Sequence, residues 1–163
     1  MILAQDFEDF VKLLNLYKVE YMVVGGYAMA FHGKPRHTGD LNIWINISVE
    51  NAEKMLQVVN DFGLGSLGFT QDDFLKEGFI TQIGYPPLRI DILNNIDGVE
   101  FNEAYKNRLS IDLDDIKVDY IGLGDFIKNK QSTGRKRDLS DVKEIQSKLK
   151  PKKSYGKRKG RRL

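Results

Sequence analysis

The chain of 163 residues contains no cysteine, and it has only two histidines, four prolines and one tryptophan. Without cysteine there is no disulfide framework and no thiolate metal site. A metal ion would therefore depend on carboxylates, with at most two imidazoles to help. Oxygen-rich sites of this kind suit hard cations such as magnesium better than zinc. The absence of cysteine also favours a reducing compartment, and we expect a cytoplasmic protein.

Long apolar runs and an N-terminal secretory signal are missing too. The longest apolar stretches are only a few residues, far below the ~20 that a membrane helix needs. The N-terminus reaches Asp6 and Glu8 without a basic segment followed by an apolar one. We therefore expect no membrane partner. With 41% hydrophobic and 29% charged residues, the composition is typical of a single globular domain.

Positive charge is distributed unevenly along the chain. The last fourteen residues, 150–163, hold eight of the 25 lysines and arginines and no acid. Residues 1–149 hold the other 17 basic residues and all 23 acidic ones, so their net charge is −6 although that of the whole chain is +2. We therefore divide the chain into a globular domain, 1–149, and a basic tail, 150–163. Such tails bind phosphate backbones by releasing counterions, which makes RNA a predicted partner. The alternative is a solvated tail that only aids solubility.

Hydrophobic periodicity predicts an α/β fold, with a small mixed sheet flanked by helices. The clearest strand covers 40–47, where polar and apolar residues alternate strictly. Its apolar face carries four aliphatic residues, and its polar face carries Asp40, Asn42, Trp44 and Asn46. Other strands are predicted over 20–24, 79–84, 88–93, 109–113 and 116–121, and helices from about Phe7, over 26–33, after Ser48, over 70–75 and 101–108, and in two final segments, 125–131 and 138–149. Gly63 to Gly68 reads as a glycine-rich loop.

Acidic side chains on two of these strands predict a metal site. Asp40 and position 42 share one face of their strand, and Asp91 lies on the polar face of another. Clustered carboxylates repel one another unless a cation lies between them. Magnesium held by one or two carboxylates and by substrate phosphates explains such a cluster. In the simpler alternative, Asp40 only opens a strand and Asp91 pairs with Arg89 or with a helix terminus.

Gly25 and Gly26 lie between a predicted strand and a predicted helix. Glycines at such a junction allow a phosphate to approach the backbone, where a helix N-terminus offers free N–H donors. The alternative is a tight turn with no ligand. We expect the two histidines, His32 and His37, to serve in polar packing or substrate contact rather than as metal ligands.

The order of these features is informative. A strand, Gly25-Gly26, a spacer of thirteen residues, Asp40-Leu41-Asn42-Ile43 and a later Asp91 together resemble the signature of the DNA polymerase beta-like nucleotidyltransferases. The chain is most similar to small stand-alone bacterial members of the abortive-infection and toxin–antitoxin type. The segments that carry this resemblance are GGYAMAFHGKPRHTGDLNIWI, ENAEKML, RIDIL and KNKQSTGRKRDLSDV, and it extends from about Phe7 to Ile145.

The resemblance implies a metal-dependent enzyme that moves a nucleoside monophosphate from a nucleoside triphosphate, such as ATP, to a hydroxyl group. The acceptor would be an RNA, for example a tRNA, or a protein. Asp40, Asn42 and Asp91 would hold the catalytic Mg²⁺ or Mn²⁺, and Asp91 would assist deprotonation of the hydroxyl. The nucleotide-binding residues would be Gly25, Gly26, Arg36, Thr38, Lys130 and Arg135, with Asp138 following them. An antitoxin partner is a further implication. For Lys130 and Arg135 the alternative is a solvated basic helix face.

Asn42 departs from the family pattern, which has Asp or Glu at this position. Asparagine keeps the shape and one acceptor oxygen of aspartate but loses its negative charge. Metal affinity should fall, so transfer activity as the chain stands should be weak or absent. Two explanations remain open: a naturally degenerate, non-catalytic nucleotide- or RNA-binding relative, or an active enzyme disarmed by an Asp→Asn substitution.

Overall fold

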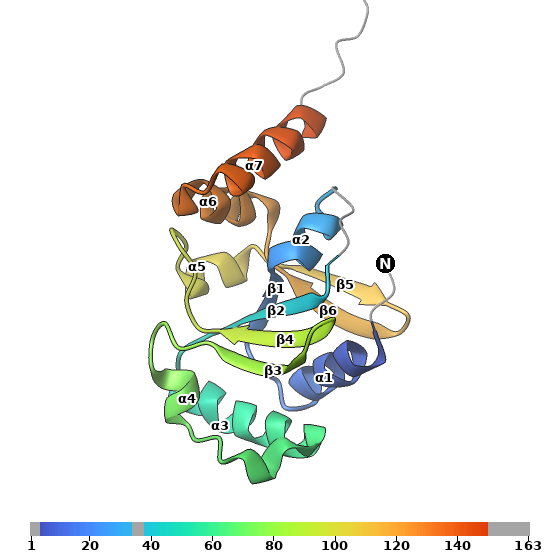
Figure 1. Cartoon of the computed structure of the whole chain (residues 1–163), viewed down its shortest axis with the longest axis vertical. Helices are drawn as coiled ribbons and strands as arrows, with labels where there is room; N and C mark the ends of the chain where they lie inside the picture. Colours follow the sequence, from blue (N-terminus) through green and yellow to red (C-terminus); the bar gives the residue numbers. More distant parts are fainter. Residues whose placement is uncertain (1–3, 34–37, 150–163) are drawn as a thin grey trace, which may run out of the picture.

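A six-stranded mixed sheet organises the part of the chain that the computed structural model describes, residues 4–33 and 38–149 (Figure 1). The strands are β1 (Tyr21–Val24), β2 (Asp40–Ile45), β3 (Thr81–Tyr85), β4 (Leu88–Leu93), β5 (Leu109–Leu113) and β6 (Ile116–Tyr120). Their order across the sheet is β3-β4-β2-β1-β6-β5. β2 is parallel to β4, β1 is parallel to β6, and the other neighbouring pairs are antiparallel. The predicted α/β fold with a small mixed sheet is confirmed.

Helices cover both faces of this sheet. They are α1 (Gln5–Leu16), α2 (Gly25–Phe31), α3 (Val49–Val59), α4 (Asp72–Leu75), α5 (Phe101–Lys106), α6 (Leu123–Thr133) and α7 (Lys136–Leu149), with two short helical turns, η1 (Asn60–Leu64) and η2 (Gly65–Leu67). In the view of Figure 1, α2, α6 and α7 lie above the sheet, and α1, α3 and α4 lie below it. No helix among the described residues is both long enough and apolar enough to cross a bilayer.

Local sequence signals account for several of these elements. The apolar residues of the opening helix, Phe7, Phe10, Val11 and Leu14, are all fully buried in α1. The Ser48 side chain accepts a hydrogen bond from the Asn51 backbone N–H, as expected of the residue that caps α3. The predicted hairpins are present as β3–β4 and β5–β6. The core therefore forms where the apolar periodicity indicates.

One expectation about local structure was wrong, and one needs an addition. The glycine-rich segment predicted as a loop falls within the short helical turns η1 and η2, and Gly63, with a φ of 98°, kinks the chain inside η1. The addition concerns Trp44, which lies on the same face of β2 as Asn42 and Asn46, as the alternation predicts, but is not open to solvent. Its side chain is only 1% exposed, because Phe101 of α5 packs edge-on against the indole with ring centroids 5.0 Å apart.

The alternation of β2 determines which face of the sheet carries its polar side chains. Leu41, Ile43 and Ile45 are buried and belong to the main core, together with residues of α1 and α3. Asp40 and Asn42 point to the other face and are only partly buried. This face is covered in part by α6 and α7, so the polar residues of β2 lie at a hollow between the sheet and the last two helices.

Candidate active site

The β2–β4 pairing brings the three predicted metal-binding positions together. In this parallel register Asn42 lies opposite Asp91, and Asp40 lies opposite Arg89. Adjacent strands are ~4.8 Å apart, so the side chains on this face are close neighbours. The sequence alone did not establish this register, because α3, η1, η2, α4 and β3 lie between the two strands along the chain.

Arg89 lies between the two carboxylates. Its Nη2 donates to Asp40 Oδ2 and to Asp91 Oδ2, each at 3.0 Å, and its Nε donates to Asp91 Oδ1 at 2.7 Å. The hydrogen bond from Arg89 to Asp91, with the negative charges of Asp91 and Asp40, raises the pKa of the guanidinium. The pairing of Asp91 with Arg89 was the simpler alternative in the sequence interpretation. The structure adds that the same guanidinium also binds Asp40.

These residues supply oxygen donors for a hard cation, but not a complete site. Among the described residues no group of three or more histidine, cysteine or acidic side chains is placed to hold a metal. Asp40 and Asp91 are two carboxylates, and Asn42 can add a neutral amide oxygen. Magnesium commonly takes one or two carboxylates and completes its shell with water and substrate phosphates. The donor set fits such an ion if phosphates contribute and if the Arg89 guanidinium leaves.

The two glycines allow side chains of neighbouring segments to approach α2. A Cβ at Gly25 would be 2.1 Å from Asn42 Nδ2, and one at Gly26 would be 2.7 Å from Thr38 Oγ1. Gly25 also has a φ of 69°, which favours glycine. Both positions therefore need glycine for the packing of β2 and its preceding segment against α2. Their predicted role toward phosphate remains a prediction.

Lys130 enters the site from α6, and Arg135 enters it from the position just before α7. The Lys130 side chain is 11% exposed, and its Nζ lies 3.1 Å from Asp138 Oδ1 and 3.2 Å from Asp141 Oδ2. The solvated-face alternative is therefore wrong for Lys130. Arg135 has a side chain that is 76% exposed, and its Nε lies 3.0 Å from Asp138 Oδ2.

Asp138 is the centre of this small network. Burial alone would raise the pKa of its carboxyl. Hydrogen bonds from Thr133 and Lys130, with the charges of Lys130 and Arg135, outweigh that effect and hold the pKa below its ordinary value. Asp138 is therefore a carboxylate at neutral pH, and it orients both basic side chains at the edge of the hollow.

Two adjoining cavities connect these groups. One, of about 270 Å³, is lined by Gly25 and Asn42 from the sheet side and by Lys130, Arg135 and Asp138 from the helices. The other, of about 250 Å³, shares Asn42 and the same three helical residues. It is lined in addition by Gly26, Thr38, Asp40 and Arg137. Arg137 was not singled out from the sequence, where it is one of several basic residues in a run. We call the two cavities together the cleft.

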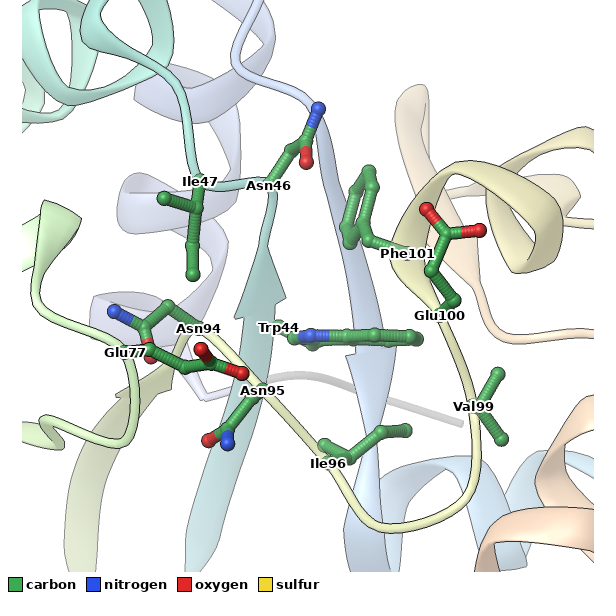
Figure 2. Close-up of a pocket in the computed structure, with 10 residues that line it drawn as sticks. All are labelled: Trp44, Asn46, Ile47, Glu77, Asn94, Asn95, Ile96, Val99, Glu100 and Phe101. Carbon is green, nitrogen blue, oxygen red and sulfur yellow. The ribbon is translucent and has the colours of Figure 1, made fainter.

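A third pocket, of about 380 Å³, continues from the cleft along the same face of β2 and shares Asn95 and Ile96 with it. Figure 2 shows Trp44 at its centre, with Phe101 and Glu100 on one side and Glu77 and Asn95 on the other. The two charged residues in its lining, Glu77 and Glu100, are both acidic. Phosphates are therefore disfavoured here, and the basic residues that can bind them lie in the cleft.

His32 does not line the cleft. His32 packs between aromatic rings, and its Nε2 lies 2.7 Å from the Ile121 carbonyl oxygen. Burial lowers the pKa of His32, and the bond to Ile121 offsets this only in part. The expectation of polar packing is thus met for His32. Arg36, His37 and the basic tail lie outside the described residues.

The fold, with carboxylates on two adjacent strands facing a glycine turn and basic helical residues, defines a protein of the nucleotidyltransferase class. Solved structures support the fold. A candidate nucleotidyltransferase from Thermotoga maritima aligns with a TM-score of 0.57 at 13% identity, covering 87% of this chain and 91% of its own. An antigenic nucleotidyltransferase-like protein from Paracoccidioides brasiliensis aligns with a TM-score of 0.51 at 13% identity, covering 89% and 76%.

Residues 4–159 match the model of one protein family, and the chain belongs to that family, described as "Nucleotidyl transferase of unknown function (DUF2204)". A search of curated proteins gave no significant match. The family agrees with the resemblance seen in the sequence.

Proposed function

We propose that the cleft binds a nucleoside triphosphate, with its phosphates between the strand carboxylates and the basic residues of α6 and α7. The observation that carries this proposal is the parallel register that sets Asn42 beside Asp91, with Lys130 and Arg135 across a shared cavity. Polyphosphates carry several negative charges, so they need cations on more than one side. Lys130 and Arg135 are held in position by Asp138, which reduces the ordering that a ligand must impose.

The reaction that this site would support is nucleotidyl transfer. A hydroxyl oxygen of the acceptor attacks the α-phosphorus, the bond to the leaving pyrophosphate breaks, and the hydroxyl proton passes to a base. A divalent metal ion bound by Asp40 and Asp91 would polarise the phosphoryl oxygens and lower the pKa of the hydroxyl. Asp91, once released from Arg89, would accept the proton or orient the hydroxyl. Lys130 and Arg135 would offset the charge that develops on the pyrophosphate.

Asn42 limits this chemistry. It stands where the family pattern has a second carboxylate, and its neutral amide lowers the charge available to a cation. We therefore propose that the chain as it stands binds nucleotide but transfers it weakly or not at all. The second candidate function, a non-catalytic nucleotide-binding module, is favoured by the same Asn42 and by the Arg89 guanidinium that already pairs with Asp40 and Asp91.

RNA is the acceptor that we favour, with a protein hydroxyl as the other option. The support is the run of eight basic residues in 150–163, which would attract a phosphate backbone. The acidic pocket around Trp44 does not offer phosphate contacts, so an RNA chain would approach from the basic side of the cleft. Transfer RNA is one such acceptor.

The test compares the chain with its Asn42→Asp variant. Each protein is incubated with labelled ATP, GTP, CTP or UTP, with Mg²⁺ or Mn²⁺, and with total RNA plus total protein, and transfer of label is followed. We expect transfer by Asn42→Asp at a rate at least about a hundredfold above that of the unchanged chain, as for removal of one strong electrostatic contact in a transition state. The labelled fraction identifies the acceptor class.

Asn95→Asp is the matched control, because Asn95 also lines the cleft and the substitution adds the same charge at its edge. It should not restore transfer. Nucleotide binding without transfer by the chain and by Asn42→Asp would instead establish the binding module. Absence of any metal-dependent nucleotide binding by either protein would contradict both functions.

A further inference from the structure

The side chain of Arg89 is fixed on the polar face of the sheet by backbone register. Arg89 and Asp91 are two residues apart on β4 and point to the same side, and Asp40 is the β2 residue directly opposite Arg89. The guanidinium therefore reaches both carboxylates without spanning a loop. Its three hydrogen bonds, between 2.7 and 3.0 Å, come from two of its nitrogens.

Two other cations of the cleft, Lys130 and Arg135, have carboxylate partners of their own. Lys130 is held by Asp138 and Asp141, and Arg135 by Asp138. Arg89 is thus the cation that pairs directly with the strand carboxylates in the free chain. Two carboxylates and one guanidinium leave a single net negative charge here, because Asn42 contributes none.

A divalent ion and this guanidinium cannot both lie between the carboxylates. The ion needs carboxylate oxygen atoms that now accept hydrogen bonds from Arg89. Two cations bound to the same carboxylates would also lie close enough to repel each other strongly. Arg89 has room to move, since its side chain is 27% exposed and can turn outward from the two carboxylates into solvent. An exchange of one cation for the other is therefore sterically feasible.

We propose that Arg89 is the resident counter-ion of this site, which occupies the metal position in the free chain and is displaced when a divalent ion enters with the triphosphate. Arg89 thereby keeps the affinity for free metal low, and the phosphates supply the additional ligands that make the exchange favourable. The nucleotide half of this inference rests on the proposed function; the competition between Arg89 and metal does not.

The experiment measures Mn²⁺ binding without nucleotide, from the paramagnetic resonance signal of the unbound ion. It compares the unchanged chain with Arg89→Gln, Arg89→Lys and a control, Arg108→Gln. Arg108 does not line the cleft, and its Nε lies 3.4 Å from Asp119 Oδ2. Arg108→Gln therefore removes one positive charge, as Arg89→Gln does, but outside the site. We expect Arg89→Gln to bind Mn²⁺ at least about tenfold more tightly than the unchanged chain and Arg108→Gln to match the unchanged chain.

Thermal unfolding gives a second readout, because a ligand that binds the folded state raises the melting temperature. Mn²⁺ should raise it more for Arg89→Gln than for the unchanged chain. Arg89→Lys keeps the charge but not the forked geometry, so it should show an intermediate affinity. If Arg89→Gln does not fold, Arg89→Lys decides: tighter Mn²⁺ binding than the unchanged chain supports the inference. Equal or weaker binding by the folded variants overturns it.

A separate titration with nucleoside triphosphate and Mg²⁺ distinguishes the two proposals. Tighter Mn²⁺ binding by Arg89→Gln without nucleotide binding by any variant would leave the counter-ion role intact and remove the proposed function. Nucleotide binding with no effect of Arg89→Gln on Mn²⁺ affinity would leave the proposed function intact and remove the counter-ion role of Arg89.

Discussion

Gly25 illustrates how one backbone position determines the geometry of the cleft. It directly follows β1 and begins α2 with a φ of 69°, and the missing Cβ leaves space that the Asn42 amide fills. The same contact brings α2 close to the strand that carries Asp40. A side chain at this position would have to move Asn42, and with it one wall of the cleft.

We expect Gly25→Ala to reduce the free energy of unfolding by about 2–4 kcal/mol, because it combines a left-handed backbone with overpacking against Asn42. Two controls separate these causes in urea denaturation. Gly63 has a φ of 98° with open space around it, so Gly63→Ala should cost only about 1–2 kcal/mol. Gly124 in α6 has open space and no left-handed φ, so Gly124→Ala should be neutral or slightly stabilising. Equal losses for Gly25→Ala and Gly63→Ala would show that the contact with Asn42 contributes nothing.

At the scale of elements, α6 and α7 are joined by charge as well as by apolar packing. Lys130 of α6 lies between Asp138 and Asp141 of α7, and Thr133 at the end of α6 donates to Asp138 at 2.7 Å. These bonds fix the angle at which Arg135 and Lys130 meet the cleft. Stability of the helix pair and position of the basic residues therefore depend on the same carboxylate.

This dependence predicts a loss of stability in acid. The pKa of Asp138 is lower in the folded chain than its ordinary value of 3.8, so the folded state holds fewer protons than the unfolded state. The stabilisation is fully present above about pH 4 and is lost as the pH falls through the lower folded pKa. Urea denaturation between pH 7 and pH 3 should show a shallower decline for Asp138→Asn than for the unchanged chain. Asp112→Asn, at an exposed position of β5, should keep the original decline; an identical decline for Asp138→Asn would contradict the assignment.

Helices and strands with local sequence signals were predictable, whereas the contacts between elements far apart in the sequence were not. Strict alternation predicted β2 and the polar side of Asp40 and Asn42, because a sheet with one buried face imposes a period of two. Trp44 follows this alternation but is buried, because Phe101, far along the chain, covers it. The bridge from Arg89 to Asp40 depends on parallel pairing of strands 49 residues apart. The partners of Lys130 depend on how α7 folds back on α6.

At the scale of the whole molecule, the charge of residues 1–149 works against nucleic-acid binding. Residues 1–149 carry a net charge of −6, and the pocket around Trp44 adds two acidic residues next to the cleft. Such a domain repels a polyanion at long range. A bound RNA would therefore depend on local basic groups, and eight of these lie in 150–163. Attraction by the tail and repulsion by the domain have opposite dependence on salt.

Removal of 150–163 should therefore weaken RNA binding by about tenfold or more at 0.1 M salt and flatten its salt dependence. Each contacted phosphate of a single strand contributes about 0.7 to the slope of log affinity against log salt, so four contacts would give a slope of roughly −3. A variant of full length with the eight lysines and arginines of the tail replaced by glutamine should behave like the deletion if charge is the cause. Binding retained by this variant but lost on deletion would assign the contacts to other residues of the tail. Unchanged affinity and slope in both proteins would remove RNA as the favoured acceptor, and a hydroxyl on a protein would become the substrate to test with Asn42→Asp.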